Sequence, residues 1–177
     1  MRYIIATIIL FGFYSCAEKK KSIEKTAQVN ISTELTNFDL ITNFENCRNE
    51  FSKDTFELNG ISTEGGELIV FHANEINYLV LDFSVYGETG KINNIYWTDK
   101  ELRFKLVRNA LFNYDKPFYE QGYKTDSIIS FLSYQSQEIK MFDNNGIEIK
   151  SKSLVESKTK ELELFFDEMT KGIQIIK

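Results

Sequence analysis

Two side chains could support nucleophilic chemistry, and both residue types are scarce in this chain. His72 is the only histidine, and Cys47 is one of two cysteines. A cysteine beside a histidine can act as a thiol nucleophile with its base, provided that a third group orients the pair. A histidine at the end of a strand beside a turn is ordinary, however, and Cys47 has the character of a small buried apolar side chain. We therefore predict no catalytic residue.

Two short motifs have the composition of ligand-binding loops. The segment DNNGIE (143–148) offers oxygen ligands of the kind that calcium prefers, but it lacks the twelve-residue frame with a terminal glutamate. The segment GETGK (87–91) has two residues between its glycines, where a phosphate-binding loop needs four, and Ile92 follows the lysine. Both segments separate apolar runs, so we interpret them as turns. Cysteine and histidine are also too few for a zinc site, and we predict neither a metal nor a cofactor.

Carboxylates and aromatic rings are abundant, but no spacing singles out a site. The 26 acidic residues could supply the carboxylate pair of a glycosidase, although surface acids are common in any soluble protein. Aromatic residues in or beside the expected strands could form a stacking platform for a sugar or a peptide. The simpler alternative is that sheets favour aromatic residues in general. The candidates are Tyr78, Tyr86, Tyr96, Trp97, Tyr114, Phe118, Tyr119, Tyr123 and Tyr134.

The N-terminal segment has the composition of an export signal. Residues 3–14, YIIATIILFGFY, carry no charge and follow Arg2, and Ser15 and Cys16 precede a lysine-rich flank. A helix of this length would rise roughly 18 Å, well short of the ~30 Å hydrocarbon core of a bilayer. A basic start, a short apolar run and a small residue before the cut are typical of a secretory signal.

The Ser15-Cys16 ending resembles bacterial lipoprotein signal peptides, and the general layout resembles small Bacteroidota lipoproteins. This resemblance implies cleavage before Cys16, a diacylglyceryl group on its sulfur and, usually, an acylated amine. Two or more acyl chains anchor a protein stably to a membrane. Ala17 stands where the inner-membrane retention signal has aspartate, which implies the outer membrane of the cell envelope. The alternatives are a plain signal peptide with an accidental cysteine and an uncleaved N-terminal anchor.

Three segments follow from this interpretation. Residues 1–15 are the expected signal peptide, residues 16–33 a polar lipidated tether, and residues 34–177 a single α+β domain. A lipidated Cys16 leaves Cys47 without an intramolecular disulfide partner. The competing hypothesis is a Cys16–Cys47 disulfide, which lipidation would exclude.

The composition is that of a folded domain with an acidic surface. The chain has 177 residues, of which 42% are hydrophobic and 14% aromatic, enough for a core. Residues 16–177 hold 20 Lys and Arg against 26 Asp and Glu, a net charge of −6. An acidic chain repels phosphate backbones, so we expect no nucleic-acid partner.

Apolar spacing divides the domain into a helix followed by strands. From Leu35 to Phe51 apolar residues recur every three or four positions, which predicts a helix that ends near residues 53–54. The period then becomes two, which predicts strands joined by short turns. The strand segments are TFELNGIST (55–63), ELIVFH (67–72), EINYLVLDFSVY (75–86), KINNIYW (91–97), ELRFKLVRNALFNY (101–114), SIISFLSYQSQEIKMF (127–142) and IEIKS (147–151).

Two details of these strands are specific enough to be tested. Alternation within residues 101–114 places Leu102, Phe104 and Leu106 on one face. Asn145-Gly146 predicts a hairpin turn, because both residue types tolerate a positive φ. Short loops between strands require antiparallel neighbours, so we expect a meander.

The last element is predicted to be a helix that packs on the sheet. Ser153 and Glu156 have the spacing of a capping box, and Gly172 stands where the helix should end. Packing the apolar stripe of this helix on the apolar face of the sheet gives an α+β fold. It is an antiparallel β-meander sheet packed against a C-terminal helix, with a shorter helix before the sheet. The stripe consists of Leu154, Lys158, Leu162, Phe165 or Phe166, Met169 and Ile173.

Three classes of function remain open. The first, which we prefer because no catalytic constellation is evident, is a non-enzymatic binding or interaction module with a ligand or a protein partner in the envelope. The second is an immunity or inhibitor-type lipoprotein that blocks a toxic enzyme, and an acidic patch beside exposed aromatics would favour it. The third is a carboxylate-based hydrolase, which a pocket with two perturbed carboxylates would favour.

Overall fold

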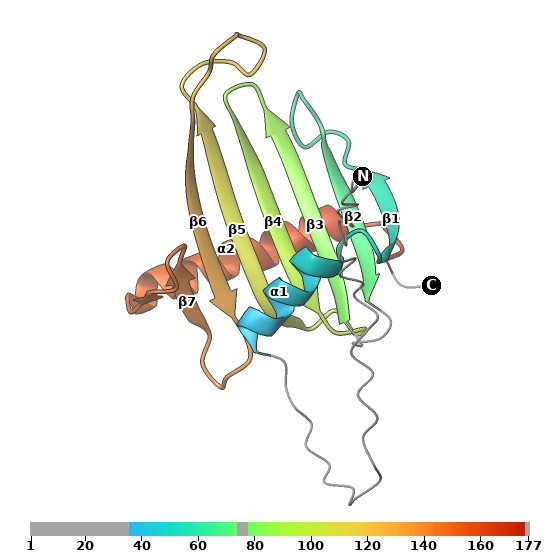
Figure 1. Ribbon diagram of the computed structural model, residues 1–177, viewed down its shortest axis with the longest axis vertical. Coiled ribbons are helices and arrows are strands. Elements are labelled where there is room, and N and C mark those ends of the chain that lie inside the picture. Colours follow the sequence, from blue (N-terminus) through green and yellow to red (C-terminus); the bar gives the residue numbers. More distant parts are fainter. Residues whose placement is uncertain (1–35, 74–77, 176–177) are drawn as a thin grey trace, which may run out of the picture. The chain divides into compact units, whose positions relative to one another are not determined.

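One antiparallel sheet forms the centre of the molecule, and a helix lies against each of its faces (Figure 1). The computed structural model describes residues 36–73 and 78–175. The strands follow one another in the sheet in the order of the sequence, which confirms the predicted meander and the α+β class. The predictions for Cys16, the signal peptide and the tether lie outside the described residues.

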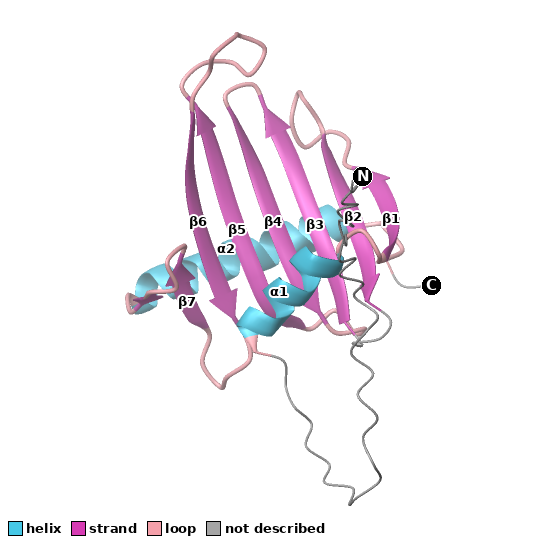
Figure 2. Cartoon of the chain, in the orientation of Figure 1, coloured by secondary structure: helices cyan, strands magenta, loops and turns pink. Residues whose placement is uncertain are grey.

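The elements are joined by short connections, as a meander requires. Figure 2 shows that the shorter helix precedes the sheet and that the longer one follows it. In chain order they are α1 (Asn37–Cys47), β1 (Ser52–Glu57), β2 (Gly66–Ala73), β3 (Tyr78–Gly87), β4 (Gly90–Thr98), β5 (Phe104–Tyr114), β6 (Thr125–Ser133), β7 (Lys140–Asp143), β8 (Glu148–Ile149) and α2 (Lys152–Thr170).

Helix α2 covers one face of the sheet, which we call the α2 face. Leu162 and Phe166 are buried there, and the ring of Phe166 lies 5.0 Å from that of Tyr96. The hydroxyl of Tyr96 also donates a 2.8 Å hydrogen bond to the carbonyl of Leu162. The apolar stripe and the polar end of one tyrosine therefore fix the helix to the sheet. None of the helices in the described part of the chain is long and apolar enough to cross a membrane.

Helix α1 covers only part of the opposite face, which we call the α1 face (Figure 1). Its fully buried residue Phe44 lies edge-on against Phe71 at 5.1 Å and against Trp97 at 5.8 Å. Its first turn is closed by a capping box in which Thr36 and Asp39 exchange hydrogen bonds. The rest of the face, toward the turn between β3 and β4, is not covered by any other described helix or strand.

The boundaries of both helices differ from the sequence prediction. Helix α1 ends at Cys47, about six residues early, because Ser52–Glu57 pairs with β2 instead of continuing the helix. Phe51 still packs against Phe44, with ring centroids 6.3 Å apart. Phe51 continues the apolar spacing of the helix because it contacts the same core, although it is not itself helical. The predicted capping box of α2 was wrong, because the N-cap is Ser151 and its side chain makes no capping bond.

The strand details are partly confirmed. A turn follows Asp143 as predicted, with Gly146 at φ +77° and its N–H donating to the Asp143 carbonyl. The prediction that Leu102, Phe104 and Leu106 share one face was wrong. An irregularity in the β4–β5 pairing turns Phe104 toward α2 and Leu106 toward α1.

Two further details differ from the prediction, and one agrees with it. The segment 127–142 is two strands rather than one, since β6 ends at Ser133 and β7 begins at Lys140. In α2, Leu154 is 45% exposed, and Val155 packs on the core instead. Gly172, with φ +82°, stands just beyond the end of the helix as predicted.

Candidate binding site

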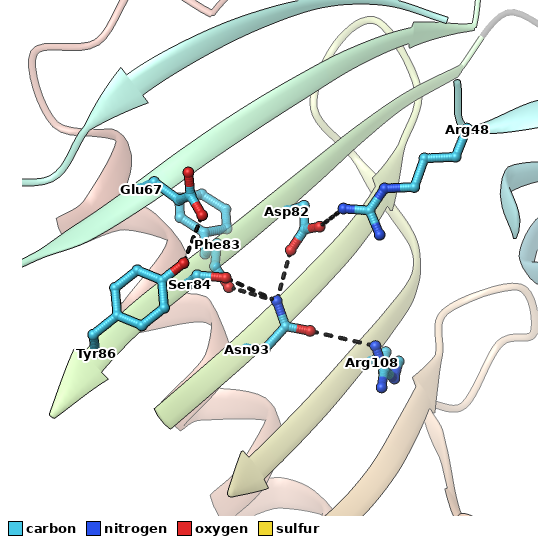
Figure 3. A network of polar contacts seen from close by, with 8 residues as sticks. All are labelled: Arg48, Glu67, Asp82, Phe83, Ser84, Tyr86, Asn93 and Arg108. Atoms are coloured by element: carbon cyan, nitrogen blue, oxygen red, sulfur yellow. Dashed lines mark hydrogen bonds and ion pairs between the residues drawn. The ribbon is translucent and has the colours of Figure 1, made fainter. Parts of the chain in front are cut away.

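Polar side chains occupy the part of the α1 face that α1 leaves uncovered. The strand register places Glu67, Ser84, Asn93 and Ala110 in one row across β2 to β5. The next row toward α1 contains Asp82, Ile95 and Arg108, which lie opposite one another on β3, β4 and β5. The strand face is apolar beneath the helix and becomes polar immediately beside it, where Figure 3 shows the polar side chains.

A partly buried ion pair joins the end of α1 to the sheet. Nη2 of Arg48 donates to Oδ2 of Asp82 at 2.5 Å, and the carboxylate side chain is only 7% exposed. The Arg48 guanidinium also lies 5.2 Å and 5.1 Å from the ring centroids of Phe44 and Phe71. Because a buried carboxylate is costly unless it is paired, Arg48 both neutralises Asp82 and holds the helix.

Asn93 connects this ion pair to a second arginine. Its Nδ2 donates to Oδ1 of Asp82 at 2.6 Å, and it also lies within hydrogen-bond distance of Ser84 and the Phe83 carbonyl. Its Oδ1 accepts a 3.3 Å hydrogen bond from Nη1 of Arg108. Arg48, Asp82, Asn93 and Arg108 therefore form one network (Figure 3), whose last member is only half-buried.

A second polar pair borders this network on the side away from α1. The hydroxyl of Tyr86 donates to Oε1 of Glu67 at 2.6 Å, and this bond, together with burial, raises the pKa of Tyr86. The ammonium of Lys91 lies 4.9 Å from the centroid of the Tyr86 ring. The short side chains Ser84, Asn93 and Ala110 therefore lie between longer charged and aromatic ones.

An apolar hollow adjoins the network on the side of Arg108. Its volume is about 370 Å³, which is within the range of small-molecule sites. Phe131, which lines the hollow, is the residue directly opposite Arg108 in the register, and the Arg108 guanidinium donates to Asn93 on the other neighbouring strand, β4. The hollow lies between α1 and strands β5 to β7 and is lined by Asn37, Phe38, Ile41, Leu106, Phe131, Phe142, Asp143, Asn144 and Gly146.

This arrangement suits a ligand with an anionic end and an apolar end. The half-exposed guanidinium of Arg108 can donate two parallel hydrogen bonds to a carboxylate, which is the geometry that arginine favours. The neighbouring hollow can receive an apolar body. The two carboxylates nearest the network already accept hydrogen bonds. Asp82 accepts from Arg48 and Asn93, and Glu67 accepts from Tyr86.

The structure does not bring the two scarce residues together. Cys47 is the half-buried last residue of α1, and burial together with the charge of Cys47 raises the pKa of Tyr78 to about 12. His72 belongs to the α2 face, where its Nε2 lies 3.1 Å from Oδ2 of Asp54. The sheet separates the thiol from the imidazole, so they form no catalytic pair. In residues 36–73 and 78–175 no cluster of three metal-binding side chains occurs.

The aromatic candidates do not form one platform. Tyr96 and Tyr134 pack on the α2 face, and Tyr78 and Trp97 are buried beneath α1. Tyr86 belongs to the polar part of the α1 face. The other four lie in or beside the loop between β5 and β6, and they are Tyr114, Phe118, Tyr119 and Tyr123.

Sequence reasoning missed the members of the polar network. Asp82 and Asn93 lie within strand runs that are otherwise apolar, and no motif distinguishes Arg48 and Arg108 from ordinary surface charges. The available signal was a polar residue at an inward position of a strand, as in LVLDFSV around Asp82. That signal identifies single residues, whereas their assembly depends on the register of the strands.

Comparisons with protein-family models, with curated proteins and with solved structures each find no match to this chain.

Proposed function

We propose that this protein is a non-enzymatic, lipid-anchored binding module of the cell envelope, whose ligand is a small carboxylate with an apolar body. The observation that supports the proposal is the position of Arg108, half-exposed at the end of a hydrogen-bonded network and opposite Phe131, which lines an apolar hollow of about 370 Å³. The network fixes the floor beneath the ligand before binding, and the hollow provides apolar contact area.

The guanidinium of Arg108 favours an anionic ligand. Arg48 is neutralised by Asp82, whereas Glu67 keeps its negative charge, because the Tyr86 phenol that donates to it is neutral. Lys91 and Arg108 remain as cationic groups along the open part of the face. A carboxylate placed at Arg108 would be attracted by that guanidinium, while its chain or ring would lie against Phe131 and Ile41 in the hollow that Asp143 also lines.

The hydrogen bonds that the Asp82 carboxylate already accepts favour a binding role over hydrolysis. A general acid or base must reach the reacting proton with an oxygen that is not already committed. Both oxygens of Asp82 accept hydrogen bonds within the network.

The anchoring part of the proposal rests on the lipoprotein-like ending Ser15-Cys16.

A set of matched probes tests the ligand class. Octanoate and phenylacetate carry both ends, acetate lacks the apolar body, octanol lacks the charge, and inorganic phosphate is an anion without the carboxylate geometry. We expect octanoate or phenylacetate to raise the melting temperature of residues 16–177, with a stabilisation of about 2.7 kcal/mol at a hundredfold excess over Kd. Acetate, octanol and phosphate should have little effect.

Variants identify the site that the probes use. Arg108→Ala should abolish the stabilisation, and Phe131→Ala should weaken it, whereas Lys160→Ala on the exposed side of α2 should not change it. If no probe stabilises the protein, or if Arg108→Ala keeps the full shift, this site is not the binding site.

Anchoring is tested separately. We expect Cys16→Ser to release the protein from the membrane fraction while the circular dichroism of the domain stays unchanged. A Cys16→Ser protein that still sediments with membranes would contradict lipidation.

A further inference from the structure

A second surface lies at one end of the sheet, away from the polar network. In a meander, alternate connections lie at the same end of the sheet. The connections β1–β2, β3–β4 and β5–β6 therefore lie together at the upper end of the molecule in Figure 1. We call residues 59–65, 87–90 and 115–124 the distal surface.

Hydrogen bonds between these connections fix their relative positions. The N–H of Phe118 donates to the carbonyl of Glu88 at 3.0 Å, and the N–H of Tyr114 donates to the carbonyl of Thr89 at 2.9 Å. The Tyr119 hydroxyl donates to Oε1 of Glu88. On the other side, the hydroxyl of Ser62 donates to the Tyr86 carbonyl at 2.6 Å. The distal surface is therefore organised before any partner binds, which lowers the entropic cost of binding.

Aromatic rings are exposed on this surface. Phe118 is 44% exposed, Tyr119 is 64% exposed and Tyr123 is 41% exposed. They form two ring pairs, Phe118 with Tyr119 at 5.5 Å and Tyr123 with Tyr114 at 5.0 Å. Tyrosine is among the residues that dominate the binding energy of protein interfaces, and aromatic residues are enriched there in general.

Carboxylates surround these rings. The distal surface contains four acids and two lysines, a net charge of −2, and all four acids are exposed. One of the lysines, Lys116, donates a 2.6 Å hydrogen bond to the carbonyl of Gln121. The acids are Glu64, Glu88, Asp115 and Glu120.

A hollow of about 500 Å³ lies beside the turn that connects β3 and β4. Its apolar lining includes Ile61, Val85, Ile92 and Leu111, and Ile92 is 37% exposed. These residues belong to the α2 face beyond the part that α2 covers. The hollow gives a partner a place for an apolar anchor side chain next to the acidic rim.

The distal surface also lies far from the point where the chain enters the domain. Asn37, the first residue of α1, accepts a 3.1 Å hydrogen bond from Ser133 at the last position of β6. The loop 115–124 precedes the first position of the same strand. The length of β6 therefore separates the distal surface from Asn37.

We propose that the distal surface docks onto a basic protein surface, with the exposed rings as anchors and the carboxylates as electrostatic complement. Its three connections comprise 21 residues, and a specific protein interface uses about 20–30 residues on each side. A protein partner therefore fits its extent better than one sugar ring does. This inference goes beyond the small-ligand function proposed for the polar face, and the two sites are at different parts of the sheet.

Selection of random peptides on the immobilised domain tests this inference, because it requires no identified partner. We expect the selected peptides to be enriched in Lys and Arg beside an aliphatic or aromatic residue. Their affinity should fall at least about tenfold for Glu64→Lys/Glu120→Lys and for Phe118→Ala/Tyr119→Ala. It should also fall steeply with added salt.

Two controls separate this result from the other site and from misfolding. Arg108→Ala should bind the peptides normally, and so should Lys160→Glu. All variants are compared by circular dichroism and thermal melting, and only variants that melt as the wild type does are scored. Enriched peptides without basic residues, or basic peptides that bind the distal variants as tightly as the wild type, would overturn the inference. Binding of neutral oligosaccharides at Phe118–Tyr123 with no basic peptide selected would also overturn it.

Discussion

The Arg48–Asp82 ion pair provides the sharpest test of how α1 is held on the sheet. Asp82 is 7% exposed and Arg48 is 38% exposed in their side chains. Removing one member of a fully buried pair costs about 3–5 kcal/mol, whereas a surface pair is worth about 0–1 kcal/mol. Because one partner here is partly exposed, we expect Arg48→Met to lower the free energy of unfolding by about 2–3 kcal/mol.

Methionine is chosen because it keeps part of the packing. Its thioether can lie over the rings of Phe44 and Phe71, so the variant mainly removes the charge. The second variant, Asp82→Asn, removes the opposite charge with little change in shape. If the cost of Arg48→Met comes from an unpaired buried carboxylate, adding Asp82→Asn to it should restore at least about 1 kcal/mol.

Urea unfolding measures these differences, and amide hydrogen exchange locates them. Exchange should rise first in α1, because that helix loses its attachment to the sheet. A cost of Arg48→Met below about 1 kcal/mol would show that the ion pair is not needed. A double variant that is less stable than Arg48→Met alone would refute the explanation by charge burial.

Three further predictions concern the core, a turn and the titration of a tyrosine. Leu162→Ala should lower the free energy of unfolding in urea by about 2–5 kcal/mol, because Leu162 is buried. Leu164 is 52% exposed, so Leu164→Ala should change it by no more than about 0.5 kcal/mol. Equal losses for the two variants would contradict the packing of α2 on the core. Gly90→Ala should cost about 1–3 kcal/mol, since the added Cβ would lie 2.6 Å from the carbonyl oxygen of Phe112, and an unchanged melting temperature would contradict that contact. The pKa of Tyr78 is raised to about 12, so the neutral phenol is favoured in the folded state, and Tyr78 should contribute a loss of stability of about 1.4 kcal/mol per pH unit between about pH 10 and 12, in addition to the losses from Tyr96 and Tyr134, whose pKa values burial also raises; Tyr78→Phe should reduce the total slope by that amount, and an unchanged slope would contradict the assignment.

The sequence predicted the fold well because the meander depends on local signals. Alternating apolar residues and short turns such as that at Gly146 determine where each strand ends and which strand it pairs with. The helix α2 was predicted from its apolar stripe, although the predicted stripe included Leu154, whereas Val155 is the residue that packs on the core. Errors arose where pairing overrides local pattern, as at Phe51, or where an irregular strand pair moves Phe104 and Leu106 to opposite faces.

The candidate site was less predictable for the same physical reason. Arg48, Asp82, Asn93 and Arg108 come from one helix end and three strands, and only the register brings them together. Local spacing contains no information on that register across β3 to β5. The distal surface could be foreseen only in part, because the aromatic and acidic residues of 115–124 are adjacent in sequence while Glu64 and Glu88 join them through the fold.

The arginine side chains themselves report most directly on the proposed role of Arg108 in holding the anionic end of a ligand. In residues 34–177 these are Arg48, Arg103 and Arg108. Their Nε–H signals can be followed by NMR while octanoate is added. We predict a saturable shift of the Arg108 signal, with Arg48 and Arg103 nearly unchanged. An Arg108 signal that stays in place, or one that moves no more than that of Arg103, would contradict this role of Arg108.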